Sequence, residues 1–129
     1  MNYFKQDLAS LHADLVAKKL SAKELTQATF DNIKATDPKI DAFLALNEDA
    51  ALDQAAKVDA AGIKEDQPLA GIPVAIKDNI VTKDLTTTAA SKILTNFNPL
   101  YDATVTTKLA DAQMITVGKT NMDEFAMGG

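Results

Sequence analysis

The amino-acid sequence predicts an α/β fold with a largely parallel sheet that helices cover. Segments with helical spacing of apolar residues alternate with short, continuous apolar runs, and such runs are typical of strands buried on both faces. Polar residues directly follow two of these runs, at the strand ends where ligands gather in open α/β sheets. The 129 residues suffice for one domain with a substantial core.

The first part of the chain indicates two helices. Apolar residues recur at helical spacing over about residues 5–18. Ser21 and Glu24 are spaced as a capping box, because the serine hydroxyl can accept a backbone N–H while the glutamate reaches back to residue 21. The helix that begins there runs to about Lys34, since Pro38 disfavours a helical conformation in the residue before it. The side chains expected to be buried on it are Leu25, Ala28, Thr29 and Ile33.

A strand and a third helix follow. The short apolar run 42–46 is a strand candidate, and Asn47 is a favourable N-cap for the alanine-rich helix predicted over about residues 48–61. Gly62 is placed to end that helix, because glycine readily adopts the left-handed conformation found at helix ends.

The second half of the chain predicts two further strands separated by a turn-rich region. Residues 73–76 form one apolar run, entered through a Gly-Ile-Pro turn, and residues 114–117 form the other. Between them, residues 86–94 should hold a turn and the start of a helix. Another helix is expected over about residues 103–112, with Asp102 as its N-cap.

Composition excludes several classes of function. The net charge of −5, with basic residues interspersed among acidic ones, argues against a large nucleic-acid interface. The absence of cysteine excludes disulfides and thiolate metal sites. The start of the chain lacks the apolar core of a signal peptide, and no apolar run approaches the roughly 18 residues of a membrane span. The sequence therefore predicts a soluble, cytoplasmic chain.

Lys77 is the first candidate for chemistry, because it ends an apolar strand and a buried lysine is costly unless it is paired or neutral. Two interpretations stay open. Its side chain could extend out from the strand end or pair with Asp78. Alternatively, desolvation lowers the pKa of its ammonium until it acts as a base near neutral pH, with Asp78 and Asn79 orienting it.

Polar residues also follow the run 114–117, so two strands could deliver side chains to one edge of the sheet. These residues are Lys119, Thr120 and Asn121. The Gly-Lys-Thr sequence at 118–120 is not a phosphate-binding loop, because Gln113 stands where that motif requires an earlier glycine.

Other polar residues fit structural roles better than chemical ones. Asp123 and Glu124 lack a third metal ligand and suit the first turn of a helix. His12 lies in a helical pattern with no partner ligand and is expected to be a surface histidine or one whose hydrogen bonds are satisfied. None of the serines has a glycine-rich elbow or a base nearby in sequence. They are Ser10, Ser21 and Ser91.

Four motifs resemble the amidase signature family, and the resemblance covers essentially the whole chain. They are GIPVAIKDNI at 71–80, TTAASKIL at 87–94, YDATV at 101–105 and GKTNMDEFAMGG at 118–129. The lysine motif is shared across the family, whereas the DEFAMGG ending resembles its tRNA-dependent branch, the glutaminase subunits of amidotransferases. Asp84 and Gln113 depart from the family pattern, since relatives often carry glycine there.

The resemblance implies a mixed sheet flanked by helices and a Ser–cis-Ser–Lys hydrolase that releases ammonia from glutamine. Lys77 stands at the position of the family's catalytic lysine, the base of the proton relay. Ala126, Met127 and Gly128 match a stretch that lines the substrate pocket, although a glycine-ended turn with Met127 in the core is an alternative. No metal or cofactor is implied for this chain itself.

The same resemblance implies partners. The tRNA-dependent branch works with a B subunit, which uses ATP and Mg²⁺, and with a small C subunit. Misacylated Glu-tRNA(Gln), or Asp-tRNA(Asn) in some organisms, would be reached through that complex, and no membrane is involved.

Residues 1–129 are expected to be the N-terminal segment of a single amidase domain, ending before the two catalytic serines of the family. Such a segment should be inactive alone and should expose a sheet edge and apolar surface. Two alternatives remain: another amidase signature hydrolase acting on small amides, and a non-catalytic segment that binds the B or C subunit.

Overall fold

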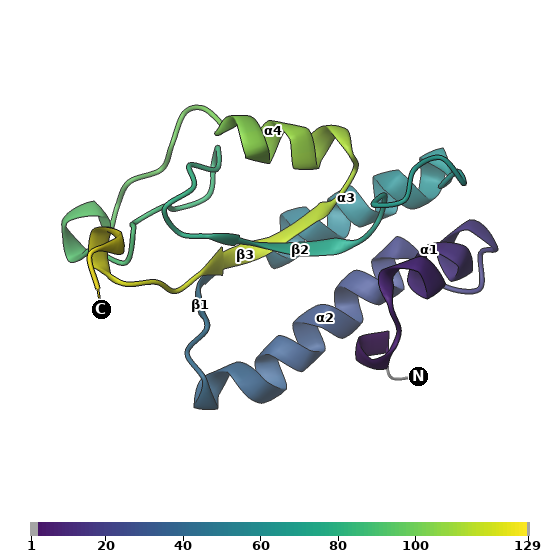
Figure 1. The fold of residues 1–129 in the computed structure, drawn as a ribbon, viewed down its shortest axis with the longest axis horizontal. Helices are drawn as coiled ribbons and strands as arrows, with labels where there is room; N and C mark the ends of the chain where they lie inside the picture. Colours follow the sequence, from purple (N-terminus) through teal and green to yellow (C-terminus); the bar gives the residue numbers. More distant parts are fainter. Residues whose placement is uncertain (1–2, 129) are drawn as a thin grey trace.

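A computed structural model describes residues 3–128 and shows a three-stranded mixed sheet with helices on both sides (Figure 1). The strands are β1 (Phe43–Leu46), β2 (Pro73–Lys77) and β3 (Ile115–Thr120), in the order β1-β3-β2. β2 runs parallel to β3, whereas β1 runs antiparallel to it. The predicted α/β class is therefore confirmed, and the parallel character holds for the β2–β3 pair.

Four α-helices surround this sheet. They are α1 (Leu8–Val16), α2 (Ala22–Thr36), α3 (Glu48–Ala61) and α4 (Thr104–Asp111). α1 and α2 lie on one side of the sheet and α4 on the other (Figure 1). Short 3-10 turns complete the structure: η1 (Tyr3–Lys5), η2 (Asp37–Lys39), η3 (Lys92–Leu94) and η4 (Glu124–Ala126). Within residues 3–128, no helix combines the length and apolar character needed to cross a bilayer.

The core lies where α2 and α3 pack against β3. One face of α2 is buried through Leu25, Phe30 and Ile33, and small residues of α3 allow the two helices to approach closely. Of the side chains expected to be buried on α2, Leu25 and Ile33 are buried, while Ala28 and Thr29 are half-buried. The remaining core side chains of α3 and β3 are Ala51, Ala55, Val58, Ile115 and Val117.

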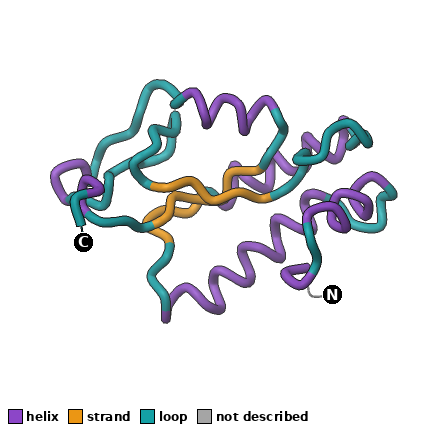
Figure 2. Tube along the Cα trace, viewed as in Figure 1, coloured by secondary structure: helices purple, strands orange, loops and turns teal. Residues whose placement is uncertain are grey.

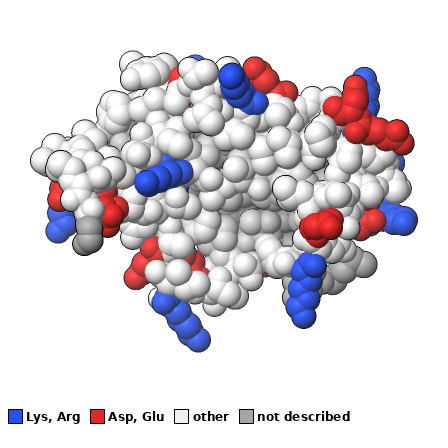
Figure 3. Space-filling view, in the orientation of Figure 1, with Lys and Arg blue, Asp and Glu red and all other residues white. Residues whose placement is uncertain are grey.

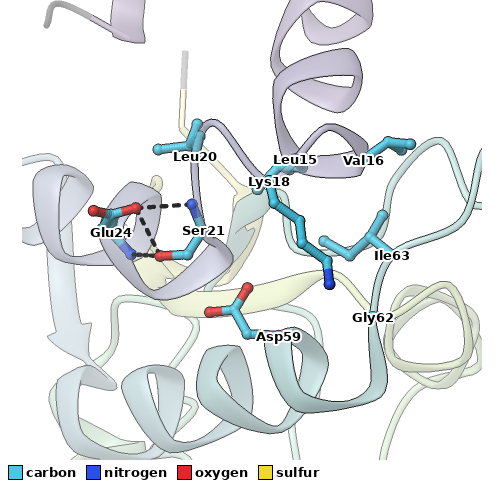
Figure 4. Close-up of a pocket in the computed structure, with 9 residues that line it drawn as sticks. All are labelled: Leu15, Val16, Lys18, Leu20, Ser21, Glu24, Asp59, Gly62 and Ile63. Carbon is cyan, nitrogen blue, oxygen red and sulfur yellow. Dashed lines mark hydrogen bonds between the residues drawn. The ribbon is translucent and has the colours of Figure 1, made fainter.

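The start of α2 confirms the predicted capping box. Ser21 Oγ accepts the N–H of Glu24, and the Glu24 carboxylate accepts the N–H of Ser21 (Figure 4). Asp59 of α3 adds a tertiary cap, because its two carboxylate oxygens accept the N–H groups of Ala22 and Lys23 at 2.7 and 3.0 Å. The free N–H groups at this helix end are thereby satisfied from both local and distant residues.

Of two further predicted N-caps, one is confirmed in position and the other is wrong, and tertiary partners take both side chains. Asn47 is the N-cap residue of α3, but its side chain makes no capping hydrogen bond and its Nδ2 donates to the Thr116 carbonyl at 3.3 Å. Ala103, not Asp102, is the cap position of α4. Asp102 Oδ1 instead accepts the N–H of Lys83 at 2.7 Å and so fixes the loop after β2.

The chain between β2 and α4 contains less helix than expected. Its only helical turn is η3 (Figure 2). At the start of this turn, Ser91 Oγ accepts the N–H of Ile93 at 3.3 Å. Beyond α4, β3 continues past the predicted end of the strand to Thr120. This extension places Lys119 inside the strand, paired with both neighbouring strands, rather than in a loop after it.

Three departures from regular backbone matter for the sequence pattern. Gly62 ends α3 with φ of 80°, as predicted. Asp84 and Gln113 adopt φ of 61° and 62°, the left-handed region that favours glycine. This conformation explains why glycine would be common at these two places in related sequences.

Candidate active site

Lys77 is the last residue of β2 and pairs in register with Thr120 of β3. Ile76 is buried, whereas Ala75 and Lys77 are exposed, as expected for alternate residues of one strand. Lys77 is therefore not buried by the described residues, and the expectation of a desolvated lysine is not met within them. Its ammonium makes no hydrogen bond or ion pair within residues 3–128, so a pair with Asp78 is excluded there.

The buried lysine at this edge is Lys119. Its side chain is 0% exposed, and its Nζ donates to the Ile80 carbonyl at 2.6 Å and to the Thr87 hydroxyl at 2.9 Å. Nζ also lies 3.5 Å from Asp78 Oδ1, an ion-pair separation that is too long for a strong hydrogen bond. Burial lowers the pKa of the Lys119 ammonium, although the Asp78 carboxylate opposes this shift.

Asp78 is 1% exposed and binds the segment of chain just before η3. Its Oδ2 accepts both the N–H and the hydroxyl of Thr88. Its backbone N–H donates to the Thr120 carbonyl at 3.1 Å, and its carbonyl accepts the N–H of Ala89 at 2.9 Å. Asp78 and Lys119 together therefore attach the end of β2, where Lys77 lies, to β3 and to residues 87–89.

The predicted substrate-binding residues lie in and after η4. Ala126, Met127 and Gly128 are exposed, with Met127 80% exposed, so Met127 does not lie in the core formed by the described residues. η3 and η4 lie side by side at one end of the molecule (Figure 1). The Phe125 N–H donates to the Ala89 carbonyl at 3.0 Å. The structure thus joins this segment, through Ala89, to the residue that follows Lys77.

Sequence reasoning missed two contacts of this region. One is the Lys119–Asp78 pair, for which the signal was a lysine after an apolar run, the same signal that drew attention to Lys77. The other is a hydrogen bond of 2.7 Å from the Ser91 hydroxyl to Glu124 Oε1. This second contact joins residues 33 positions apart and had no local signal.

The remaining candidates have structural roles. Asp123 is the cap position of η4 and Glu124 lies in its first turn, as predicted. His12 Nε2 lies 3.2 Å from the Glu65 carbonyl oxygen. Gly118 and Lys119 lie inside β3, which confirms that they are not a phosphate-binding loop. In the described part of the chain, no group of three His, Asp or Glu side chains could hold a metal ion.

The described residues expose two sheet edges and several large apolar side chains. β1 and β2 are the outer strands of the sheet formed by the described residues. The exposed large apolar side chains include Ile93, Leu100, Tyr101 and Met127. On the face shown in Figure 3, basic and acidic side chains are scattered among one another.

A pocket at the end of the molecule away from η3 and η4 is lined by residues that already have a structural role. It lies between α1, the start of α2 and the end of α3, as Figure 4 shows. Its polar side chains include Glu24 and Asp59, which already cap α2. The candidate site is therefore the strand-end region around Lys77.

Comparison with known proteins identifies similar sequences and structures along this chain. The family model described as Amidase matches residues 24–129. A protein of Levilactobacillus brevis, named as the A subunit of glutamyl-tRNA(Gln) amidotransferase, is 80% identical over 129 residues, covering 100% of this chain and 26% of the relative. The chain therefore spans about a quarter of the length of the curated relatives it matches.

Solved structures with the same arrangement include two enzymes. The native peptide amidase of Stenotrophomonas maltophilia matches with a TM-score of 0.87 and 38% identity, over 96% of this chain and 26% of that one. The A subunit of glutamyl-tRNA(Gln) amidotransferase from Thermotoga maritima matches with a TM-score of 0.75 and 36% identity, over 99% of this chain and 25% of that one.

Proposed function

Because the chain belongs to the amidase family, we propose that it is the lysine-bearing part of the A subunit of a glutamine-hydrolysing tRNA amidotransferase. The observation that carries this proposal is the 80% identity, along the whole chain, to a relative with that name. The ammonia released from glutamine would amidate misacylated Glu-tRNA(Gln), or Asp-tRNA(Asn), in protein biosynthesis. The B subunit, with ATP and Mg²⁺, would activate that tRNA, and the C subunit would complete a cytoplasmic complex.

Lys77 would act as the base. Its amine takes a proton from a bridging serine, which takes one from a nucleophilic serine, and the nucleophile's oxygen then attacks the amide carbon of glutamine. The amide nitrogen leaves as ammonia after protonation, and water hydrolyses the acyl-enzyme to glutamate. Both serines would come from outside these 129 residues, so we expect the isolated chain to be inactive.

The structure supports this role for Lys77 by the rigidity of its surroundings. A base must be held at a fixed distance from the proton it removes. The backbone on both sides of Lys77 is fixed, because β2 pairs with β3 before it and the buried Asp78–Lys119 pair anchors the chain after it. The desolvation that a neutral lysine needs would come from a surface that covers the exposed side of β2.

Replacement of Lys77 tests the proposal. In the assembled amidotransferase, we expect Lys77→Ala to lower the rate of glutamate release from glutamine by about 10²–10⁴-fold, the contribution typical of a general base. The midpoint of thermal unfolding is measured alongside, so that a lost proton acceptor is distinguished from a lost fold. Within residues 3–128 the Lys77 side chain is exposed and has no partner to lose.

Lys83→Ala is the matched control, because Lys83 is an exposed lysine of the next loop whose contact to Asp102 uses only its backbone. It should leave glutaminase activity unchanged. A Lys77→Ala enzyme with more than a tenth of the parent rate would refute the catalytic role. If the substitution altered the formation of the complex and left the rate unchanged, the chain would be a non-catalytic binding segment.

A second candidate function is hydrolysis of small or peptide amides. It is favoured by the TM-score to the peptide amidase, 0.87, against 0.75 to the amidotransferase protein. The two functions differ in their need for partner proteins. Release of ammonia from a peptide amide by the purified full-length protein alone would favour this second function over the first.

A further inference from the structure

The segment 123–128 is held to the rest of the described chain by two hydrogen bonds. One runs from the Phe125 N–H to the Ala89 carbonyl, at 3.0 Å. The other runs from the Ser91 hydroxyl to Glu124 Oε1, at 2.7 Å. The other hydrogen bonds of the segment are internal, from the N–H groups of residues 126 and 127 to the carbonyls of residues 123 and 124.

The side chain of Ser91 is well placed to fix this segment. Ser91 is 3% exposed, and its Oγ is held from the other side by the N–H of Ile93. The hydroxyl has a single proton to donate, and it donates it to the Glu124 carboxylate. A hydrogen bond to a charged acceptor is stronger than one between neutral groups.

The backbone of both contacting segments is in a conformation that needs outside support. Ala89 and Ala90 have φ of 49° and 55°, and Phe125 and Ala126 have φ of 51° and 56°. Left-handed backbone is unfavourable for residues with a Cβ, and it persists where surrounding contacts hold it. Each pair of such residues lies beside a residue of the Ser91–Glu124 contact, which joins the two segments.

Ala89 extends this connection to the lysine. Its N–H donates to the Asp78 carbonyl at 2.9 Å, while its carbonyl accepts the N–H of Phe125. The residue after Lys77 and the residue before Ala126 are therefore both bound to Ala89. A change in the position of segment 123–128 is thereby coupled to the strand end that carries Lys77.

We propose that Ser91 and Glu124 are positioning residues that hold segment 123–128 in place to bind the amide substrate beside Lys77. The inference rests on the proposed function, because it takes this segment as substrate-binding. Ser91 and Glu124 do not touch the reacting atoms and act only through the position of the segment. Loss of their hydrogen bond weakens substrate binding more than it slows the chemical step.

The test uses the assembled enzyme with Ser91→Ala, Glu124→Ala and the double variant. We expect amide hydrogen exchange in residues 123–128 to accelerate about tenfold in each single variant, as for loss of one charge-assisted hydrogen bond. The double variant should exchange no faster than the single ones, because all three remove the same bond. KM for glutamine should rise about tenfold while kcat stays within about twofold.

Two controls separate positioning from general loosening of the loop. Glu124→Gln keeps an acceptor for the Ser91 hydroxyl, so its KM for glutamine should be close to that of the parent. Thr86→Val removes the hydrogen bond from Thr86 to Asn98 in the same loop, without touching segment 123–128, and should leave its exchange unchanged.

Unchanged exchange of residues 123–128 in the Ser91→Ala enzyme would overturn the proposal, whatever the activity. Faster exchange with an unchanged KM would also overturn it, since the segment would then be fixed for another reason. Neither result bears on the role of Lys77, which is judged separately by the rate of the Lys77→Ala enzyme.

Discussion

Replacement of Lys119 by methionine should be among the most damaging single substitutions in this chain. Methionine has a similar length and no charge, so the change removes the ammonium while filling most of its space. The Asp78 carboxylate, 1% exposed, would then remain buried without its counter-charge. The Ile80 carbonyl and Thr87 hydroxyl would each lose a donor as well.

The size of the effect follows from this burial. Removal of one partner of a buried ion pair costs about 3–5 kcal/mol, mostly because the other charge stays in a site with little water. The measurement is the free energy of unfolding, obtained by urea denaturation of the full-length protein that contains these residues. Adding Asp78→Asn should recover about half of the loss, because asparagine is neutral and can still accept from Thr88.

Lys34→Met is the matched control. Lys34 and Glu48 form a closer ion pair, 2.6 Å against 3.5 Å, but the Lys34 side chain is 54% exposed. Water screens such a pair, so its loss should leave the unfolding midpoint near that of the parent. The reasoning is refuted if Lys34→Met destabilises as much as Lys119→Met, because distance and not burial would then decide the energy.

Three further predictions concern stability. Gly118→Ala should destabilise the chain by about 1–3 kcal/mol in urea unfolding, since the added methyl would overlap the Ala45 carbonyl of β1. At Gly62 the space is open but φ is 80°, so Gly62→Ala should lower the free energy of unfolding by about 1–2 kcal/mol. The N–H of Ser21, followed by its hydroxyl, lowers the pKa of the Glu24 carboxyl from its ordinary value of 4.5. The stabilisation that the Glu24 carboxylate gives to the folded state is therefore complete above pH 4.5 and disappears as pH falls through the lowered pKa. The difference in stability between the parent and Glu24→Ala should vanish at acid pH, and a constant difference would contradict the capping role.

The order of elements could be predicted because it depends on local patterns. Helical spacing and the capping box located α2, and continuous apolar runs located the strands, with β3 extending further than expected. The position of Lys77 at the end of β2 follows from the same patterns. Family membership also came from the sequence, because its motifs need no three-dimensional information.

The identity of the buried lysine was decided by the tertiary structure. Lys77 and Lys119 each lie at or near the end of an apolar run, so the sequence treats them alike. The strand order β1-β3-β2 makes β3 central, and residues 78–89 bring their polar groups to Lys119. Lys77 shares a face of β2 with Ala75, and both side chains are exposed within residues 3–128, whereas Ile76 on the other face is buried. Burial is set by what packs over a residue from elsewhere in the chain, and no local pattern records it.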